Sequence, residues 1–207
     1  MHRRTGAHFQ SRIIATCLLL LISATCIAAT EADYSRLPDT ATHEQALTLR
    51  LQKLKDLLAQ AGTYQRYILL DTAAKTAFDL NQYDQATAYA QELIALAPKF
   101  QDDWNYSSAV HNANIILGRT ALLKNDIASA KQFLLAAGKV PYSKILDDRG
   151  ADLQLASDLL AQHQRETVSQ YLQDCIRLWP HDRDRLEHWR QQLAEGKNPN
   201  LLTDQAE

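Results

Sequence analysis

Apolar residues recur along this chain at intervals of three and four, and short polar breaks separate the apolar stretches. This spacing is typical of amphipathic helices, and no stretch of useful length shows the strict alternation that indicates a strand. The first regular stretch opens at Thr42-His43-Glu44-Gln45, which matches a capping box, and ends at Gly62. One face of this helix carries Leu47, Leu51, Leu54 and Leu58. The pattern predicts an all-α protein.

A helix, a turn and a second helix are predicted around LLKNDIASAKQFLLAAGKVP, residues 122–141. The polar break is Asn125-Asp126, and Gly138 and Pro141 end the second helix. Such a pair cannot bury its apolar face alone. We therefore expect similar pairs on either side of it.

Small residues recur in two sets with the same spacing. The first set is Ala74, Gly118 and Ala156, and the second is Ala86, Ala130 and Val168. Successive members of the second set are separated by the same two intervals as successive members of the first set. Each member of the second set therefore follows the matching member of the first set by the same number of residues. This offset is expected if each unit has two helices that approach closely at one small residue on each. We predict three helix pairs at about residues 64–98, 104–141 and 148–180, with Asp102 or Asp103 capping the second pair.

A last helix is predicted from Asp182 to Glu195. Its apolar residues Leu186, Trp189 and Leu193 would face inward and its charged residues outward, as the end of a helical repeat requires. Residues 197–207 are expected to form a loose tail, within a C-terminal part that spans residues 181–207.

These segments resemble the tetratricopeptide repeat. The second unit carries Leu117-Gly118-x-x-Ala121-x-x-x-Asn125-Asp126-Ile127-x-x-Ala130, which is similar to the family's L-G-x-x-Y…G-D-x-x-x-A pattern with Ala for the aromatic residue. In the first unit, Asn81-Gln82-Tyr83-Asp84-Gln85-Ala86 and Leu96-Ala97-Pro98 are similar to the turn and the second helix. The third unit, residues 155–180, has Val168 where Ala is usual. The resemblance implies a short α-solenoid of three antiparallel helix pairs within residues 63–180, with a capping helix at each end.

Three segments, residues 111–141, 155–179 and 185–202, also resemble a group of uncharacterised bacterial repeat proteins. This second resemblance implies no particular activity. The connection VPYSKILDDRGAD differs from that group because it lacks the expected loop rich in glycine and serine.

Residues 1–29 have the pattern of a secretory signal peptide. A basic start precedes the apolar run IIATCLLLLI, and the small residues of SATCIAAT follow. Cleavage is expected after Ala28 or Ala29, which would make the protein periplasmic or secreted, with residues 30–62 as an N-terminal segment and helix. Two alternatives stay open: an uncleaved anchor, for which the apolar run is short, and a lipoprotein beginning at Cys26.

Charge and cysteine content narrow the function further. The chain has 22 basic and 24 acidic residues and no basic stretch, which argues against nucleic acid as a partner. Once the predicted signal peptide is removed, Cys175 is the remaining cysteine, so no internal disulfide can form. We expect Cys175 to be an inert core thiol.

No arrangement typical of catalysis was found. The six glycines do not cluster, so a phosphate-binding loop is absent, and neither G-x-S-x-G nor H-E-x-x-H occurs. We predict a protein that is not an enzyme and uses no cofactor or metal. A metal site from His181, Asp184 and His188 is conceivable, although a solvated surface is the simpler interpretation. His111 is interpreted as a capping or groove-lining residue.

The resemblance implies that the first helices of the pairs line a concave groove that binds a peptide or a protein. Lys75 and Arg119 occupy equivalent positions in adjacent units. The predicted groove residues are Asp71, Lys75, Phe78, Asn112, Ile115, Arg119, Leu122, Leu153, Ser157 and Leu160.

Two other functions remain open. The apolar groove could join two copies of the chain in a homodimer. Alternatively, Trp104, Tyr106 and the connection from Tyr142 to Arg149 could build the site of an envelope sugar-binding protein or enzyme.

Overall fold

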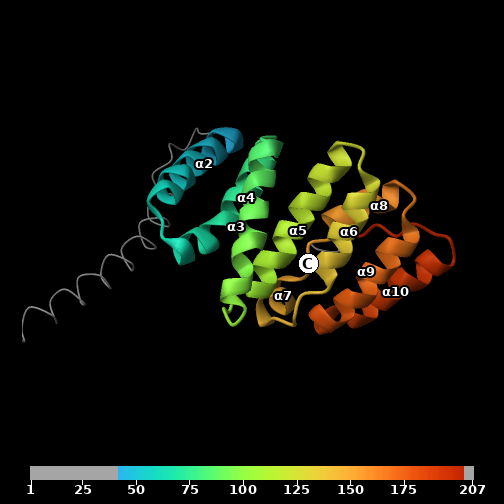
Figure 1. Ribbon diagram of the computed structural model, residues 1–207. Helices are drawn as coiled ribbons and strands as arrows, with labels where there is room; N and C mark the ends of the chain where they lie inside the picture. The colour runs from blue at the N-terminus through green and yellow to red at the C-terminus, as the bar shows by residue number, and fades with distance from the viewer. Residues whose placement is uncertain (1–41, 203–207) are drawn as a thin grey trace, which may run out of the picture. The chain divides into compact units, whose positions relative to one another are not determined.

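The computed structural model describes residues 42–202, and the predicted signal peptide lies outside this range. The chain divides into two units between Ala46 and Leu47, so that residues 42–46 belong to the first unit and residues 47–202 to the second. The regular elements of the described residues are all helices, and no strand occurs among them. The elements are α2 (His43–Gln60), α3 (Thr63–Asp79), α4 (Tyr83–Leu96), η2 (Ala97–Phe100), α5 (Tyr106–Leu123), α6 (Ile127–Gly138), α7 (Lys144–Arg149), α8 (Gln154–Ala161), α9 (Arg165–Leu178), η3 (Pro180–Asp182) and α10 (Arg183–Ala194). The prediction of an all-α protein is confirmed (Figure 1).

The predicted capping box at the start of α2 is present. The amide of Thr42 donates to Gln45 Oε1 at 2.9 Å, and the amide of Gln45 donates to Thr42 Oγ1 at 3.3 Å. These bonds satisfy two amide groups that the first turn of a helix leaves free. Further along the helix, Leu51, Leu54 and Leu58 are buried, as their spacing predicts.

Three turns with the same backbone geometry join consecutive helices. Asn81, Asn125 and His163 have φ angles of 59°, 59° and 60°, the left-handed conformation that often follows the end of a helix. In each turn the next amide donates to the carbonyl oxygen five residues before it: Gln82 to Ala77, Asp126 to Ala121 and Gln164 to Leu159. The turns follow one another at the same two intervals as the small residues. Residues 42–202 therefore contain three helix–turn–helix segments whose turns have the same geometry.

The small residues of the two sets lie inside the fold, and a close contact between helices is seen at one of them, Gly118. All six members of the two sets are buried. At Gly118 on α5, a Cβ atom would lie 2.2 Å from Leu155 Cδ2 of α8 and 3.2 Å from Phe133 Cβ of α6. No side chain fits at that point unless its neighbours move.

The first helices of successive helix–turn–helix segments, which are α3, α5 and α8, pack each against the next. Helix α3 contacts α5, and α5 contacts α8, while α4 packs against α5 and α6 packs against both α8 and α9. Residues from these helices form two main apolar clusters. Cys175 lies in one of them, and burial raises the pKa of its thiol to about 12, in line with the predicted inert thiol.

Two predicted boundaries are wrong. Helix α5 begins after Asn105, because Asp103 Oδ1 accepts a hydrogen bond from the Asn105 amide at 3.0 Å instead of capping the helix. In the third unit, the first helix begins at Gln154 rather than near residue 148 and has only eight residues. The chain first forms α7 and then breaks at Gly150, whose φ of 76° suits glycine and which lies against the Trp179 ring.

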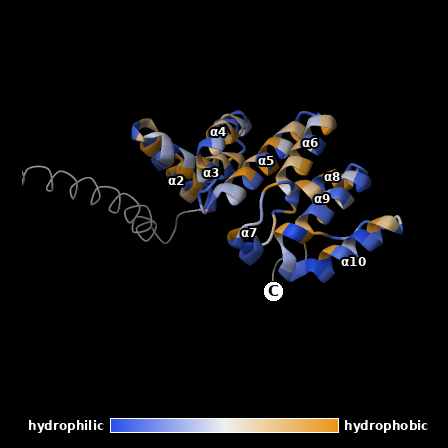
Figure 2. Ribbon diagram, turned by 60° about the horizontal axis from the view of Figure 1, so that its bottom comes forward, coloured by the Kyte–Doolittle hydropathy of each residue, from blue (hydrophilic) through white to orange (hydrophobic). Residues whose placement is uncertain are grey.

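The C-terminal part differs from the prediction beyond its helix. Leu186, Trp189 and Leu193 of α10 are buried as expected, and much of the rest of the helix is hydrophilic (Figure 2). The segment after α10 is not loose up to residue 202. Pro199 and Leu201 are buried there, and Arg165 Nε donates to Asn198 Oδ1 at 2.8 Å. Burial of these two apolar side chains explains why the segment packs.

Candidate functional site

The predicted groove residues Phe78, Arg119 and Leu122 line one cavity of about 370 Å³ between α3, α5 and α8. The guanidinium carbon of Arg119 lies 4.4 Å from the centre of the Phe78 ring, which is a cation–π arrangement. The same guanidinium donates from Nε to Asp158 Oδ2 at 3.2 Å. Arg119 is thus held between an aromatic ring and a carboxylate.

A second pair of predicted groove residues meets nearer the other end of these helices. Asn112 Nδ2 of α5 donates to Asp71 Oδ2 of α3 at 3.2 Å. The other carboxylate oxygen, Asp71 Oδ1, is buried and has no hydrogen-bond partner among the described residues. Burial raises the pKa of Asp71, because a carboxylate in apolar surroundings favours its neutral form.

The remaining groove residues divide into exposed and buried ones. Lys75 is exposed, and Ser157 is partly buried. Ile115, Leu153 and Leu160 are at most 4% exposed and belong to the apolar core. The expectation that these three offer an apolar binding surface is therefore wrong, because each is enclosed by neighbouring helices.

The structure also brings together the residues named for a sugar-binding site. Trp104 and Tyr142 are 68% and 53% exposed and line one cavity of about 650 Å³. Tyr106 and Ser107 of α5 also line it, together with Ser143, Lys144, Ile145 and Asp148. Two exposed aromatic faces thus share an open cavity with hydroxyl, ammonium and carboxylate groups.

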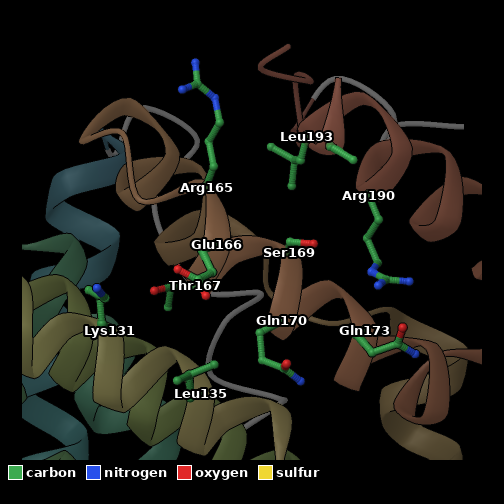
Figure 3. Close-up of a pocket in the computed structure, with 11 residues that line it drawn as sticks. Lys131, Leu135, Arg165, Glu166, Thr167, Ser169, Gln170, Gln173, Arg190 and Leu193 are labelled. Atoms are coloured by element: carbon green, nitrogen blue, oxygen red, sulfur yellow. The ribbon is translucent and has the colours of Figure 1, made fainter. Parts of the chain in front are cut away.

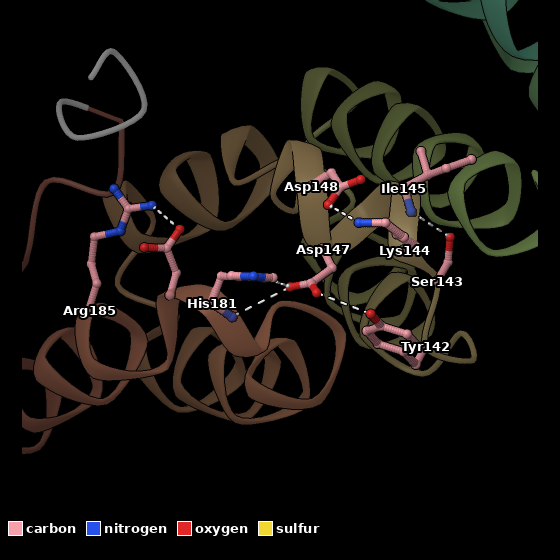
Figure 4. Close-up of polar contacts among 9 residues, drawn as sticks. Tyr142, Ser143, Lys144, Ile145, Asp147, Asp148, His181 and Arg185 are labelled. Atoms are coloured by element: carbon pink, nitrogen blue, oxygen red, sulfur yellow. Dashed lines mark hydrogen bonds and ion pairs between the residues drawn. The ribbon is translucent and has the colours of Figure 1, made fainter.

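A buried carboxylate binds Tyr142, one of the two exposed aromatic residues of this cavity (Figure 4). Asp147 accepts hydrogen bonds from Tyr142 Oη at 3.1 Å and from His181 Nδ1 at 2.7 Å, and its side chain is only 4% exposed. Burial alone would raise the pKa of Asp147, but the bonds from His181 and Tyr142 lower it below its ordinary value. The bond to Asp147 in turn raises the pKa of His181. No spacing in the sequence reveals this contact, which joins residues 34 apart.

The conceivable metal site does not assemble. His181 binds Asp147, while His188 Nε2 lies 2.8 Å from Gln192 Nε2. Within residues 42–202, no group of three or more His, Cys, Asp or Glu side chains could hold a metal ion.

His111 is a core residue and not a groove residue, contrary to the prediction. It is fully buried, with Nδ1 3.1 Å from the carbonyl oxygen of Ala137 and with Nε2 accepting from the Asp152 amide at 3.2 Å. A neutral imidazole with its proton on Nδ1 satisfies both contacts. Burial lowers the pKa of His111 and favours that neutral form.

No model of a known protein family matches the chain, and no curated protein or solved structure is significantly similar to it. No helix in the described part of the chain has both the length and the apolar character needed to cross a membrane. Any function must therefore be inferred from the chemistry of these sites.

Proposed function

We propose that the protein is an exported, non-catalytic interaction module, similar to tetratricopeptide repeats, that binds a peptide or protein through the face formed by α3, α5 and α8. The equivalent turns, the close approach at Gly118 and the contacts between first helices support this arrangement. The pattern of residues 1–29 supports export. The observation that carries the proposal is the cavity lined by Phe78, Arg119 and Leu122.

The chemistry of this cavity favours a ligand with an aliphatic side chain beside an acidic group. Leu122 and Ile127 supply apolar surface in the cavity, and Leu123 at its edge is 55% exposed. Burial of apolar area yields about 25 cal/mol per Å². An acidic group would compete with Asp158 for Arg119, and such a partly solvated contact contributes on the order of 1 kcal/mol or less. Affinity should accordingly be modest and rest mainly on apolar contact.

A catalytic role has no support in the same cavity. The groups around it with acid–base chemistry are Arg119 and Asp158, which are paired with each other. No described residue in its lining combines a nucleophile with a neighbouring base, as covalent catalysis requires.

The test is a selection of short peptides on the purified protein, followed by titration of the best binder. We expect selection of peptides with aliphatic and acidic residues. The double substitution Lys75→Glu/Arg119→Glu should weaken binding roughly tenfold. The charge reversal Lys139→Glu, at an exposed position after α6, should leave affinity unchanged. Equal affinity of the double variant and the unchanged protein would refute the groove.

Homodimerisation through the same face is the less favoured alternative. It requires a large apolar surface, and the burial of Ile115, Leu153 and Leu160 within one chain removes part of that surface. Light scattering separates the two ideas, since a monomer supports peptide binding and a stable dimer that is lost on Leu123→Glu supports association.

A sugar-binding function is the second candidate, and the Trp104–Tyr142 cavity is the observation that favours it. Aromatic faces present apolar surface to the C–H groups of a sugar ring, while the nearby polar groups can bind hydroxyls. Titration with soluble oligosaccharides, followed by tryptophan fluorescence, tests this function. A saturable change that Trp104→Ala abolishes would establish it, and the absence of any change would exclude it for the sugars used.

A further inference from the structure

A third cavity, of about 580 Å³, lies on the side of the second helices. Its walls are α6, the first turns of α9, and α10 (Figure 3). Neither the groove residues nor the Trp104–Tyr142 cavity contributes to it. Whatever this cavity binds, it binds separately from the ligand of the groove.

Its lining carries more positive than negative charge. Lys131 of α6, Arg165 of α9 and Arg190 of α10 line it together with a single carboxylate, Glu166. The chain as a whole has two more acidic than basic residues, so this concentration of cations is contrary to the overall balance. Figure 3 shows Lys131 and Arg190 on opposite sides of the cavity, with Glu166 between them and Arg165 directed away.

Arg190 is incompletely paired. Its Nε is buried and finds no hydrogen-bond partner among residues 42–202. Two arginines of the first helices α3 and α5 differ, since Arg66 Nε binds Glu92 and Arg119 Nε binds Asp158. A buried donor without an acceptor is costly, and an acceptor supplied by a bound water or ion is one way in which native proteins satisfy such a group.

The other polar groups of the cavity suit an oxyanion. Thr167, Ser169, Gln170 and Gln173 also line the cavity with hydroxyl and amide groups, of which Gln170 Nε2 already donates to Asp174 Oδ1 at 3.4 Å. Guanidinium and ammonium groups form their strongest hydrogen bonds with carboxylate and phosphate oxygens. We propose that this cavity binds a small oxyanion ligand, a carboxylate or a phosphate, between Lys131 and Arg190.

Because the cavity lining contains Glu166 as well as cations, substitutions in it should change the affinity for an anion in opposite directions. Because Glu166 is the single carboxylate of the lining, it repels an anion and partly offsets the two cations beside it. Loss of its charge should tighten binding, whereas loss of either cation should weaken it. Attraction by net charge alone would produce the same opposite signs, so a cation outside the cavity must be substituted as a control.

The experiment is calorimetric titration of the protein with inorganic phosphate and, separately, with succinate, at constant ionic strength. We expect saturable binding of at least one, and the tighter of the two identifies the class of ligand. Lys131→Gln and Arg190→Gln should each weaken it roughly fivefold, and Glu166→Gln should strengthen it. Arg183→Gln removes a charge from the same helix at an exposed position and should have no effect.

Two results would overturn the proposal. One is the absence of saturable binding of either anion up to about 10 mM, beyond which affinity is negligible. The other is an equal loss of affinity in Arg183→Gln and Arg190→Gln, which would assign the effect to net charge. Because Glu166→Gln is expected to gain affinity, misfolding of a variant cannot imitate the full pattern.

Discussion

The imidazole of His111 on α5 stacks on the ring of Tyr171 on α9, with the ring centroids 6.3 Å apart. The hydroxyl of Tyr171 donates to the carbonyl oxygen of Asp152 at 2.9 Å, while the amide of Asp152 donates to His111 Nε2. These contacts join the second and third units at the point where the chain enters α8. The histidine accordingly has a structural role.

Protonation of His111 should weaken the fold. Its pKa is lower in the folded than in the unfolded chain, so its contribution is fully present above the unfolded value of about 6.5 and is lost as the pH falls through the folded value. Of the nearby charges, Asp152 raises this pKa and Lys75 lowers it. Urea unfolding between neutral and mildly acidic pH should show a loss of stability that His111→Gln reduces. Identical pH dependence in both proteins would contradict the prediction.

Enlarging Gly118 should destabilise the junction of α5, α6 and α8. Even Gly118→Ala places a Cβ atom within 2.2 Å of Leu155 Cδ2, and overpacking of this kind costs roughly 1–3 kcal/mol. The matched control is Gly62→Ala, where the new Cβ atom would meet only Gln65 Oε1 at 3.5 Å. Thermal unfolding should show a clear loss for the first variant and a much smaller one for the second. Equal midpoints would mean that these helices do not approach closely.

Leu201 should contribute to stability although it follows the last helix. The side chain is fully buried in the larger apolar cluster, and truncation of a buried leucine to alanine typically costs about 2–5 kcal/mol. Leu202→Ala, at a partly buried position, should cost less. Denaturant unfolding of the two variants checks the difference. A negligible effect of Leu201→Ala on stability would mean that the segment after α10 is the loose tail that the sequence indicates.

The contact between Asp147 and His181 should be visible in the titration of the histidine. Because the bond to Asp147 raises the pKa of His181, Asp147→Asn should lower that pKa toward the ordinary value of about 6.5. Asp148→Asn is the control, since Asp148 is paired with Lys144 at 2.8 Å and influences His181 less. Histidine resonances followed by NMR report both values. A larger shift in the control would contradict the assignment.

Periodicity predicted the all-α character of the chain, because turn geometry and close helix contacts impose local requirements on residue type. Asn125 lies in a left-handed turn, and Gly118 lies at a contact where a Cβ atom would be 2.2 Å from Leu155 Cδ2. Both requirements are visible as recurring residues.

Burial was predicted less well. Ile115 and Leu160 have the spacing of a groove face, but whether such a residue is open or enclosed depends on which helix covers it. The paired contacts of Asp147 and His111 depend on residues 34 and 41 positions away. Nothing in local spacing encodes contacts of that kind. For the same reason, local spacing does not indicate that Lys131 and Arg190, on different helices, line one cavity.

The most direct test of the proposed binding face is a map of NMR chemical-shift changes on adding the selected peptide to the protein. The proposal predicts that the largest changes fall on α3, α5 and α8, around Phe78, Arg119 and Leu122, and that Phe78→Ala reduces them. Changes centred instead on Trp104 and Tyr142, or on Lys131 and Arg190, would contradict it.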